Sequence, residues 1–148
     1  MNALPFMFAA VVAGTLISAQ PPMNAILARH VGGALGATAI STAVAFICIF
    51  VLLVVVGGAD LSRQTLANVP WWVYLAGVAG AVFVAAGVII APVTGALVFF
   101  VCIIAGQLIG SSLADHFGAF GLAVREISAS RLAGLGLVVV GAVLVGRG

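Results

Sequence analysis

Residues 71–114 read WWVYLAGVAGAVFVAAGVIIAPVTGALVFFVCIIAGQLIGSSLA and contain no charged side chain. A helix crosses the hydrocarbon core of a bilayer in about 20 residues, so this segment is long enough for two crossings. Pro92 lies near its middle. Because proline removes a backbone donor, the segment predicts two membrane-spanning helices joined by a tight turn at Ala91 to Thr94.

The composition of the whole chain also indicates a protein that lies in a lipid bilayer. Hydrophobic residues make up 65% of the 148 residues and charged residues 5%, and the mean hydropathy is +1.41. A soluble domain could not cover its core with so little polar surface, which predicts an integral membrane protein. The net charge of +2 comes from five arginines and three acids. These charges form no basic strip, so we expect no nucleic-acid partner.

Three further apolar stretches complete the predicted architecture. An all-α membrane domain covering residues 1–148 is expected, with helices at about residues 4–27, 34–56, 71–91, 95–114 and 130–146. The stretch from Leu4 to Ala19 resembles a secretory signal, but no Lys or Arg precedes it and the apolar character resumes later, so we interpret it as a retained span. The last stretch is short for a crossing unless Arg131 and Arg147 extend it by snorkelling. If this helix only lay on the membrane surface, the chain would have four spans, and the number would no longer be odd.

An odd number of spans places the two chain ends on opposite sides of the membrane. One side then holds Arg63, Arg125 and Arg131, and the other holds Arg29 and Arg147. Positively charged residues favour the cytoplasmic side, and three against two is a weak bias. The count therefore favours insertion in both orientations and pairing of inverted copies, with a single orientation (N-terminus in the cytoplasm) as the alternative.

Several short motifs resemble the YdcZ-type branch of the drug/metabolite transporter superfamily. They occur in order along nearly the whole chain: Gln20 with Asn24, Pro70-Trp71-Trp72, Ala105-Gly106-Gln107-Leu108, Asp115-His116-Phe117-Gly118-Ala119-Phe120-Gly121, and Ser130-Arg131. The resemblance implies a five-helix unit similar to half of a ten-helix transporter with two inverted repeats. It also implies an exporter in the bacterial inner membrane that works as an antiparallel pair, so the expected partners are a second copy, membrane lipids and a small-molecule substrate.

No carboxylate, lysine or arginine lies in the interior of any predicted span. Small multidrug exporters of the same superfamily exchange protons for cationic drugs at a buried glutamate, and a relay of that kind is disfavoured here. We therefore expect a substrate that is polar and neutral or zwitterionic.

The polar residues that remain in the spans are the candidate substrate contacts. Gln20 and Asn24 share a helix face if the helix continues through Pro21 and Pro22, which free backbone carbonyls near the preceding turn. Such an interruption lines a transport cavity in some transporters, but it is also compatible with a kink whose amides bond to a neighbouring helix. The predicted substrate-binding residues are Gln20, Asn24, Gln107, Trp71 and Ser111.

Several of these residues have a structural alternative. Gln107 could join two helices, and Trp71 could anchor the chain at the membrane boundary, where tryptophan is enriched. Gly106 and Gly110 form a Gly-x-x-x-Gly pair that predicts the dimer interface. Asp115 opposes the dipole at its helix end, so we expect Arg131 or Arg125 to compensate its charge.

No residue pattern of an enzyme stands out: we find no nucleophile with a base and expect no cofactor and no metal site. Cys48 and Cys102 lie in apolar segments and are interpreted as free thiols. A transporter is therefore the leading hypothesis. A non-transporting subunit that packs with a larger partner, or a small dual-topology channel, is the alternative.

Overall fold

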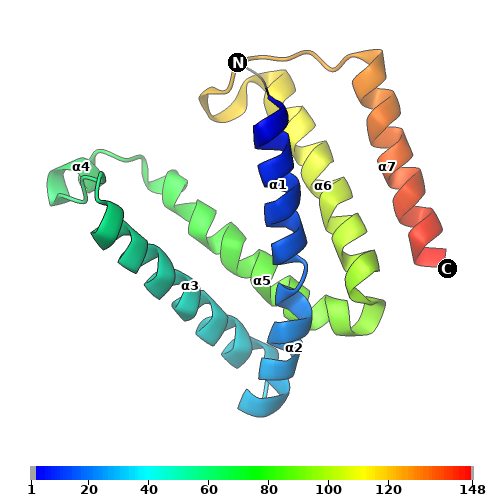
Figure 1. The fold of residues 1–148 in the computed structure, drawn as a ribbon. Helices are drawn as coiled ribbons and strands as arrows, with labels where there is room; N and C mark the ends of the chain where they lie inside the picture. The colour runs from blue at the N-terminus through cyan, green and yellow to red at the C-terminus, as the bar shows by residue number, and fades with distance from the viewer. Residues whose placement is uncertain (1–2, 148) are drawn as a thin grey trace. The chain divides into compact units, whose positions relative to one another are not determined.

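The computed structural model describes residues 3–147, and in this range every regular element is a helix. In chain order these are α1 (Leu4–Ile17), α2 (Gln20–Val31), α3 (Ala34–Val56), α4 (Arg63–Ala67), η1 (Trp71–Tyr74), α5 (Leu75–Thr94), α6 (Ala96–Phe117), η2 (Ala119–Gly121) and α7 (Ala129–Arg147). Figure 1 follows them from the N-terminus to the C-terminus.

Five helical segments are long and apolar enough to cross a bilayer. They are Leu4–Val31, Ala34–Val56, Trp71–Thr94, Ala96–Phe117 and Ala129–Arg147. The predicted all-α membrane fold with five spans is thus confirmed, and the protein is a multi-pass membrane protein. The last span includes Arg131 in its first turns and ends at Arg147, so its 19 residues exceed the uncharged part seen in the sequence.

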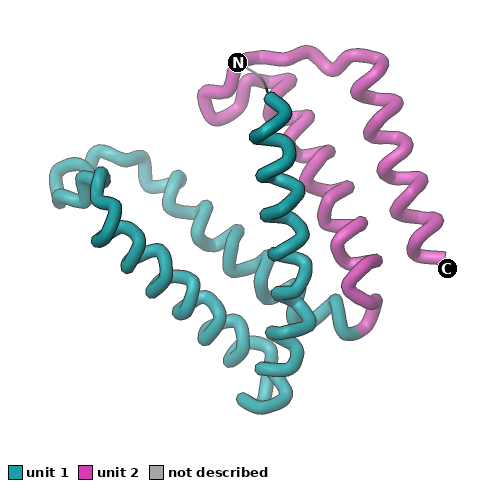
Figure 2. The backbone as a smooth tube through the Cα atoms, in the orientation of Figure 1, with its two compact units in different colours: residues 1–92 teal, residues 93–148 magenta. Residues whose placement is uncertain are grey.

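The chain divides into two compact units, residues 1–92 and residues 93–148 (Figure 2). Each unit is described by itself below. The division falls inside α5, two residues before the end of this helix. The expectation of one domain over residues 1–148 stays a prediction.

Large apolar side chains point outwards on all five spans, and the buried hydrophobic residues of the described chain are few. They are Ala37, Val88, Ala91 and Phe99. In a soluble protein this pattern would leave the apolar surface in water at a high free-energy cost, whereas lipid tails solvate it. The bilayer therefore takes the place that a hydrophobic core has in soluble folds.

In the first unit, α2 and α3 form a helical hairpin around two glycines. Gly32 ends α2 with a φ of 82°, and the Gly33 amide donates to the carbonyl of Ala28 at 2.9 Å. A positive φ of this size is rare for residues that carry a Cβ atom, so glycine permits the sharp reversal. Close to it, Ala37 of α3 and Ala91 of α5 are buried. These small side chains allow helix backbones to approach closely.

The first span is interrupted near its middle. α1 ends at Ile17 and α2 begins at Gln20, with Pro21 and Pro22 in its first turn. Proline has no amide proton, so the carbonyls of Ile17 and Ser18 cannot receive the bonds that a continuous helix would supply. The predicted end of this span near Leu27 is too early, because the helix continues for another turn to Val31.

In the second unit, α6 and α7 pack side by side and are joined by residues 118–128 (Figure 1). The carbonyl of Asp115 accepts the amides of Gly118 (3.3 Å) and Arg125 (2.9 Å), which holds the connection against the end of α6. Gly118 has a φ of 60°, and a Cβ atom there would lie 2.8 Å from Cγ2 of Val124. Glycine is thus required at this position for two reasons, conformation and space.

The turn that follows α5 lies later than the sequence predicts. The expected position, Ala91 to Thr94, is wrong, because α5 includes Pro92 and ends at Thr94. The missing amide proton of Pro92 removes only one backbone hydrogen bond, and α5 continues for just two residues beyond it, so the helix tolerates this loss. Gly95, with a φ of 84°, makes the turn into α6.

Candidate functional site

Asn24 is the most unusual polar residue of the first unit. It is 6% exposed, and its Nδ2 atom has no hydrogen-bond partner among the described residues. Thr38, the other buried polar residue in the described chain, donates its hydroxyl to the carbonyl of Ala34 at 2.9 Å. A buried amide group without a partner costs about 1–3 kcal/mol. Buried polar groups in native proteins nearly always have a partner, which makes the Asn24 side chain a candidate contact for a ligand.

Gln20 lies one turn before Asn24 on the same helix and is half-buried. α2 continues through both residues, which confirms the condition under which they share a face. Gln20 is nine residues from Arg29, or about 14 Å along the helix axis. If Arg29 lies at the boundary of a hydrocarbon core of about 30 Å, Gln20 and the interruption before it are near the midplane.

A cavity of about 520 Å³ lies where α2, α3 and α5 approach one another. Its lining residues are Ala25, Ala28, Arg29, Gly32, Gly33, Ala34, Val88 and Pro92. Neither Gln20 nor Asn24 is among them, and Asn24 lies one turn before Ala28. The first unit thus has a small-residue cavity whose one charged side chain is Arg29, next to a buried amide that lacks a partner.

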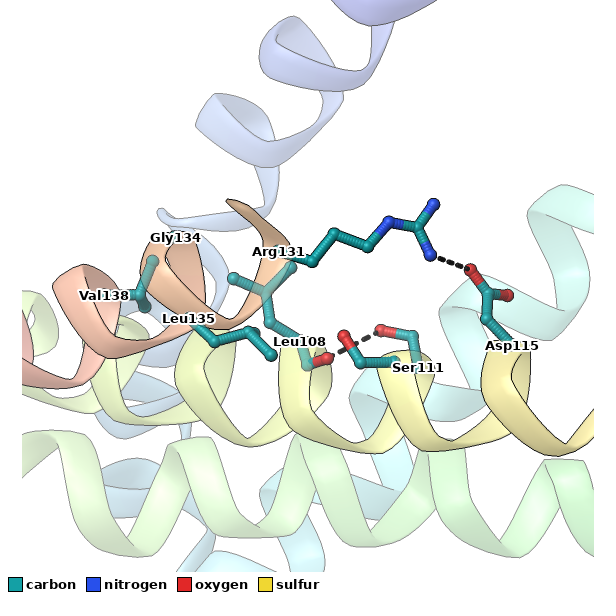
Figure 3. A pocket seen from close by; sticks show the side chains of 8 residues that line it. Leu108, Ser111, Asp115, Arg131, Gly134, Leu135 and Val138 are labelled. Carbon is teal, nitrogen blue, oxygen red and sulfur yellow. Dashed lines mark hydrogen bonds and ion pairs between the residues drawn. The ribbon is translucent and has the colours of Figure 1, made fainter. Parts of the chain in front are cut away.

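The second unit has a groove of about 430 Å³ between α6 and α7 (Figure 3). Its lining residues are Leu108, Ser111, Ser112, Asp115, Arg131, Gly134, Leu135 and Val138. The expected compensation of Asp115 by Arg131 is confirmed, since Nη1 of Arg131 lies 3.8 Å from Oδ2 of Asp115. Both side chains are about one third exposed, so the pair is accessible from outside the protein.

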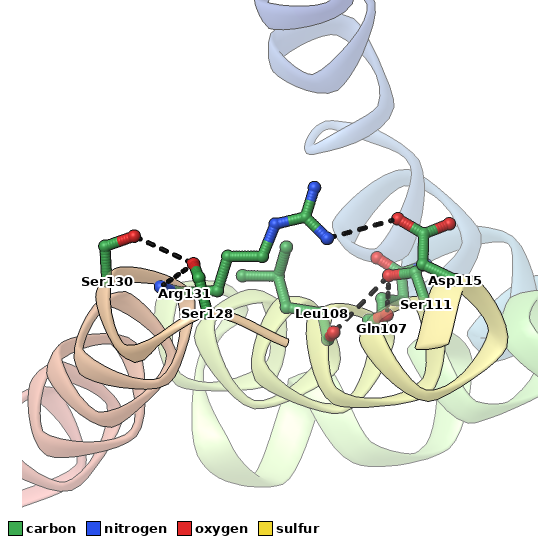
Figure 4. A network of polar contacts seen from close by, with 7 residues as sticks. All are labelled: Gln107, Leu108, Ser111, Asp115, Ser128, Ser130 and Arg131. Atoms are coloured by element: carbon green, nitrogen blue, oxygen red, sulfur yellow. Dashed lines mark hydrogen bonds and ion pairs between the residues drawn. The ribbon is translucent and has the colours of Figure 1, made fainter. Parts of the chain in front are cut away.

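Ser111 is the one predicted substrate contact that lines this groove. Its hydroxyl donates to the backbone carbonyl of Gln107 (Figure 4). Gln107 itself is exposed and is not among the lining residues. The structure therefore associates Ser111 with Asp115 and Arg131, and its link to Gln107 involves only the Gln107 backbone.

Trp71 begins the third span and is 75% exposed. It is separated from the buried Val88 by 17 residues, roughly 25 Å of helix, so it lies far from the cavity that Val88 lines. Nearby, the hydroxyl of Tyr74 donates to the carbonyl of Leu66 at 2.8 Å and connects the start of the third span to α4. The position of Trp71 suits a membrane-boundary anchor, and its role in substrate binding stays a prediction.

Gly106 and Gly110 lie on an open face of α6. A Cβ atom added to either glycine would meet no atom within 4 Å. Cys102, one turn earlier, is a free and exposed thiol. Thus residues 102, 106 and 110 form an uncovered stripe within their unit, and the predicted dimer contact at this stripe is a matter for experiment.

The sequence, compared with known protein families, has a match that covers most of the chain. Residues 5–144 match the family described as "Putative inner membrane exporter, YdcZ". The chain belongs to the YdcZ family. No curated protein and no solved structure matches the chain. As a YdcZ family member it is a multi-pass membrane protein of the transporter class, as the motifs predicted.

The predicted site of this YdcZ family chain omitted most of the groove. Leu108, Ser112 and Asp115 recur at intervals of four and three residues, as do Arg131, Leu135 and Val138. This spacing indicates that each set shares one helix face. It does not indicate that the two faces pack against each other, because both helices are apolar around most of their circumference.

Proposed function

We propose that this chain exports a small polar solute across the bacterial inner membrane as an antiparallel homodimer. The observation that carries the proposal is Asn24, whose buried Nδ2 atom has no hydrogen-bond partner among residues 3–147 and which lies in the interrupted first span. Unsatisfied backbone and side-chain groups at depth are tolerated where they line a cavity or bind a solute. Membership of an exporter family supports the same conclusion.

The size and charge of the chain support the homodimer. Five spans with their apolar faces mostly exposed are half of what an inverted-repeat transporter uses, so a second copy completes the pathway. The arginine count of three against two permits both orientations. The open stripe with Gly106 and Gly110 provides a face for close helix contact between copies.

In this mechanism the two copies exchange conformations around a central site. Gln20, Asn24 and Gln107 from each copy supply paired amide groups, and Trp71 and Ser111 contact the solute on its way to or from them. The interruption between α1 and α2 is the hinge, because the missing proline amides leave the two helices weakly coupled. Solute binding then shifts the population of the dimer towards the conformation that is open to the opposite side of the membrane.

The substrate class follows from the spans. No Lys, Glu or Asp lies in the central part of any span, so a lone charge would find no countercharge at depth. Amide groups can donate and accept hydrogen bonds. They therefore suit a solute that is neutral or zwitterionic.

The test combines orientation and flux. A variant with Cys48→Ser, Cys102→Ser and Ala59→Cys is labelled with a membrane-impermeant maleimide from either side; we expect roughly equal labelling. Purified protein in liposomes loaded with leucine, glycine betaine and glycerol should release at least one of them. The Asn24→Leu variant should abolish this release, whereas Thr15→Val, which removes an exposed hydroxyl bonded to its own helix, should retain it.

Two results would contradict the proposal. Labelling of residue 59 from one side alone would exclude inverted copies. A dimer that is stable and correctly inserted but releases none of the solutes would favour a non-transporting subunit that packs with a larger partner.

A further inference from the structure

The ion pair in the α6–α7 groove leaves most of its bonding capacity unused. The 3.8 Å between Nη1 of Arg131 and Oδ2 of Asp115 is longer than a hydrogen bond. A guanidinium has five N–H donors and a carboxylate has about four acceptor sites. Two opposite charges thus face each other in an accessible groove without a direct charge-assisted hydrogen bond.

The remainder of the groove has both apolar and hydroxyl-bearing side chains. Leu108 of α6 and Leu135 and Val138 of α7 are apolar, and Ser111 lies on α6 between Leu108 and Asp115 (Figure 3). Ser112 also lines the groove. Gly134 also lines the groove, and a Cβ atom there would meet nothing within 4 Å, so a side chain could be added at this position. A volume of about 430 Å³ falls in the range of small-molecule sites.

The helix dipoles add to the potential that each of the two side chains presents to a ligand. Arg131 lies in the first turn of α7, where the helix dipole is positive, and Asp115 lies in the last turns of α6, where it is negative. An anionic group is therefore attracted to the Arg131 end and a cationic group to the Asp115 end. The two ends are a few ångströms apart, as are the charges of an amino acid.

We propose that this groove binds a zwitterion, with its ammonium group at Asp115, its anionic group at Arg131 and its apolar part against Leu108, Leu135 and Val138. The inference rests on the proposed function, because it makes the groove an entry or exit station for the exported solute. The zwitterion lies alongside the pair, antiparallel to it, so that each of its charges forms hydrogen bonds with the opposite protein charge while the 3.8 Å contact is kept. The same chemistry is found in a soluble amino acid and in a phosphatidylethanolamine headgroup.

Three probes that contain the same isobutyl group test the charges separately. Leucine carries both charges, 4-methylpentanoate lacks the ammonium group, and 3-methylbutylamine lacks the carboxylate. Binding to the purified full-length protein is measured by calorimetry, with dihexanoyl phosphatidylethanolamine as the lipid arm. We expect the wild type to bind leucine at least about tenfold more tightly than either singly charged probe, since each charge-assisted contact contributes on that scale.

Two neutralising variants give a result that a purely structural ion pair would not. Asp115→Asn should remove the preference for leucine over 4-methylpentanoate. Arg131→Gln should remove the preference for leucine over 3-methylbutylamine. If the pair only holds α6 to α7, both variants lower the unfolding temperature and leave the order of the three affinities unchanged, which overturns the proposal.

The shape of the groove is tested without touching the charges. Gly134→Leu places a side chain in the groove and should weaken leucine binding about tenfold. Gly136→Leu adds the same side chain at an open position outside the groove. Gly134→Ala serves if the larger substitution does not fold. Equal affinities in the Gly134 and Gly136 variants overturn the proposal.

The lipid arm and the flux assay separate the remaining explanations. Binding of the short-chain lipid alone, with the same response to the variants, identifies the source of the zwitterion as a headgroup. Leucine binding that persists in a protein without solute flux refutes the proposed transport and retains the site. Flux with no binding of any zwitterion to the groove refutes the site and retains transport.

Discussion

Gly118 gives a quantitative test of how the loop after α6 is held. At a φ of 60°, replacement by alanine costs about 1–2 kcal/mol from backbone conformation alone. The new Cβ atom would also lie 2.8 Å from Cγ2 of Val124 and 3.2 Å from the carbonyl oxygen of Leu122. Valine is stiff at χ1 and the second atom belongs to the backbone, so relief requires a shift of the loop. We expect a further cost of about 1–3 kcal/mol.

Two other glycines separate these contributions. Gly121 also has a positive φ, 78°, but a Cβ atom there would meet nothing within 4 Å, so Gly121→Ala reports the conformational cost alone. Gly110 is helical and open, so Gly110→Ala should stabilise the isolated protomer by about 0.5–1 kcal/mol. The expected order of stability is Gly110→Ala, wild type, Gly121→Ala, Gly118→Ala.

The assay is equilibrium unfolding in mixed micelles, followed by circular dichroism. Hydrogen exchange of the Arg125 amide, which donates to the Asp115 carbonyl at 2.9 Å, reports the loop directly and should accelerate in Gly118→Ala. A Gly118→Ala variant as stable as Gly121→Ala would refute the steric part of the reasoning. An unchanged Arg125 amide would refute the role of Gly118 in holding the loop.

Three further predictions concern other parts of the chain. Asn24→Leu should stabilise the isolated protomer by about 1–2 kcal/mol in micelle unfolding, because it removes a buried amide group without a partner, while it abolishes flux. Hydrogen bonds from the Thr65 side chain and then from Ser62 lower the pKa of Asp60. The carboxylate therefore supports the 60–65 turn above its unfolded pKa and loses this effect as the pH falls through the lower folded pKa. Hydrogen exchange of the Thr65 amide, corrected for its intrinsic rate, should show less protection in acid, and Asp60→Asn should remove this pH dependence. Arg63→Ala makes the arginine count two against two, so the fraction of chains with the N-terminus in the cytoplasm should fall in the maleimide assay.

The number and type of the helices could be predicted from the sequence because a bilayer crossing has a fixed length. The segment from Trp71 to Ala114 is uncharged and twice that length, so two helices were the economical solution. The exact turn was not predictable from Pro92, because a proline in the last turn disrupts only one bond. Gly95, one residue beyond the predicted turn, is the residue with a positive φ that separates α5 from α6.

Helix pairing was less predictable for a related reason. In a soluble helix, the apolar stripe identifies the buried face, but these spans are apolar on nearly every side. The contact of Asp115 with Arg131 was predictable since both residues carry charge at the same membrane boundary. The burial of Asn24 had no such signal, because a single polar residue in an apolar span does not indicate which side of the helix is covered.

In the stripe formed by Cys102, Gly106 and Gly110, the thiol of Cys102 can report whether two neighbouring copies are parallel or antiparallel. If two copies of α6 cross antiparallel about a twofold axis at Gly106, each Cys102 lies opposite Gly110 of the other copy, and the two thiols are about 12 Å apart along the axis. That separation exceeds the span of a disulfide, whose Cα atoms lie within about 7 Å. Parallel copies in register would bring the same thiols together. Mild oxidation of the unmodified protein thus discriminates between the two: a covalent dimer through residue 102 would mean that neighbouring copies point the same way.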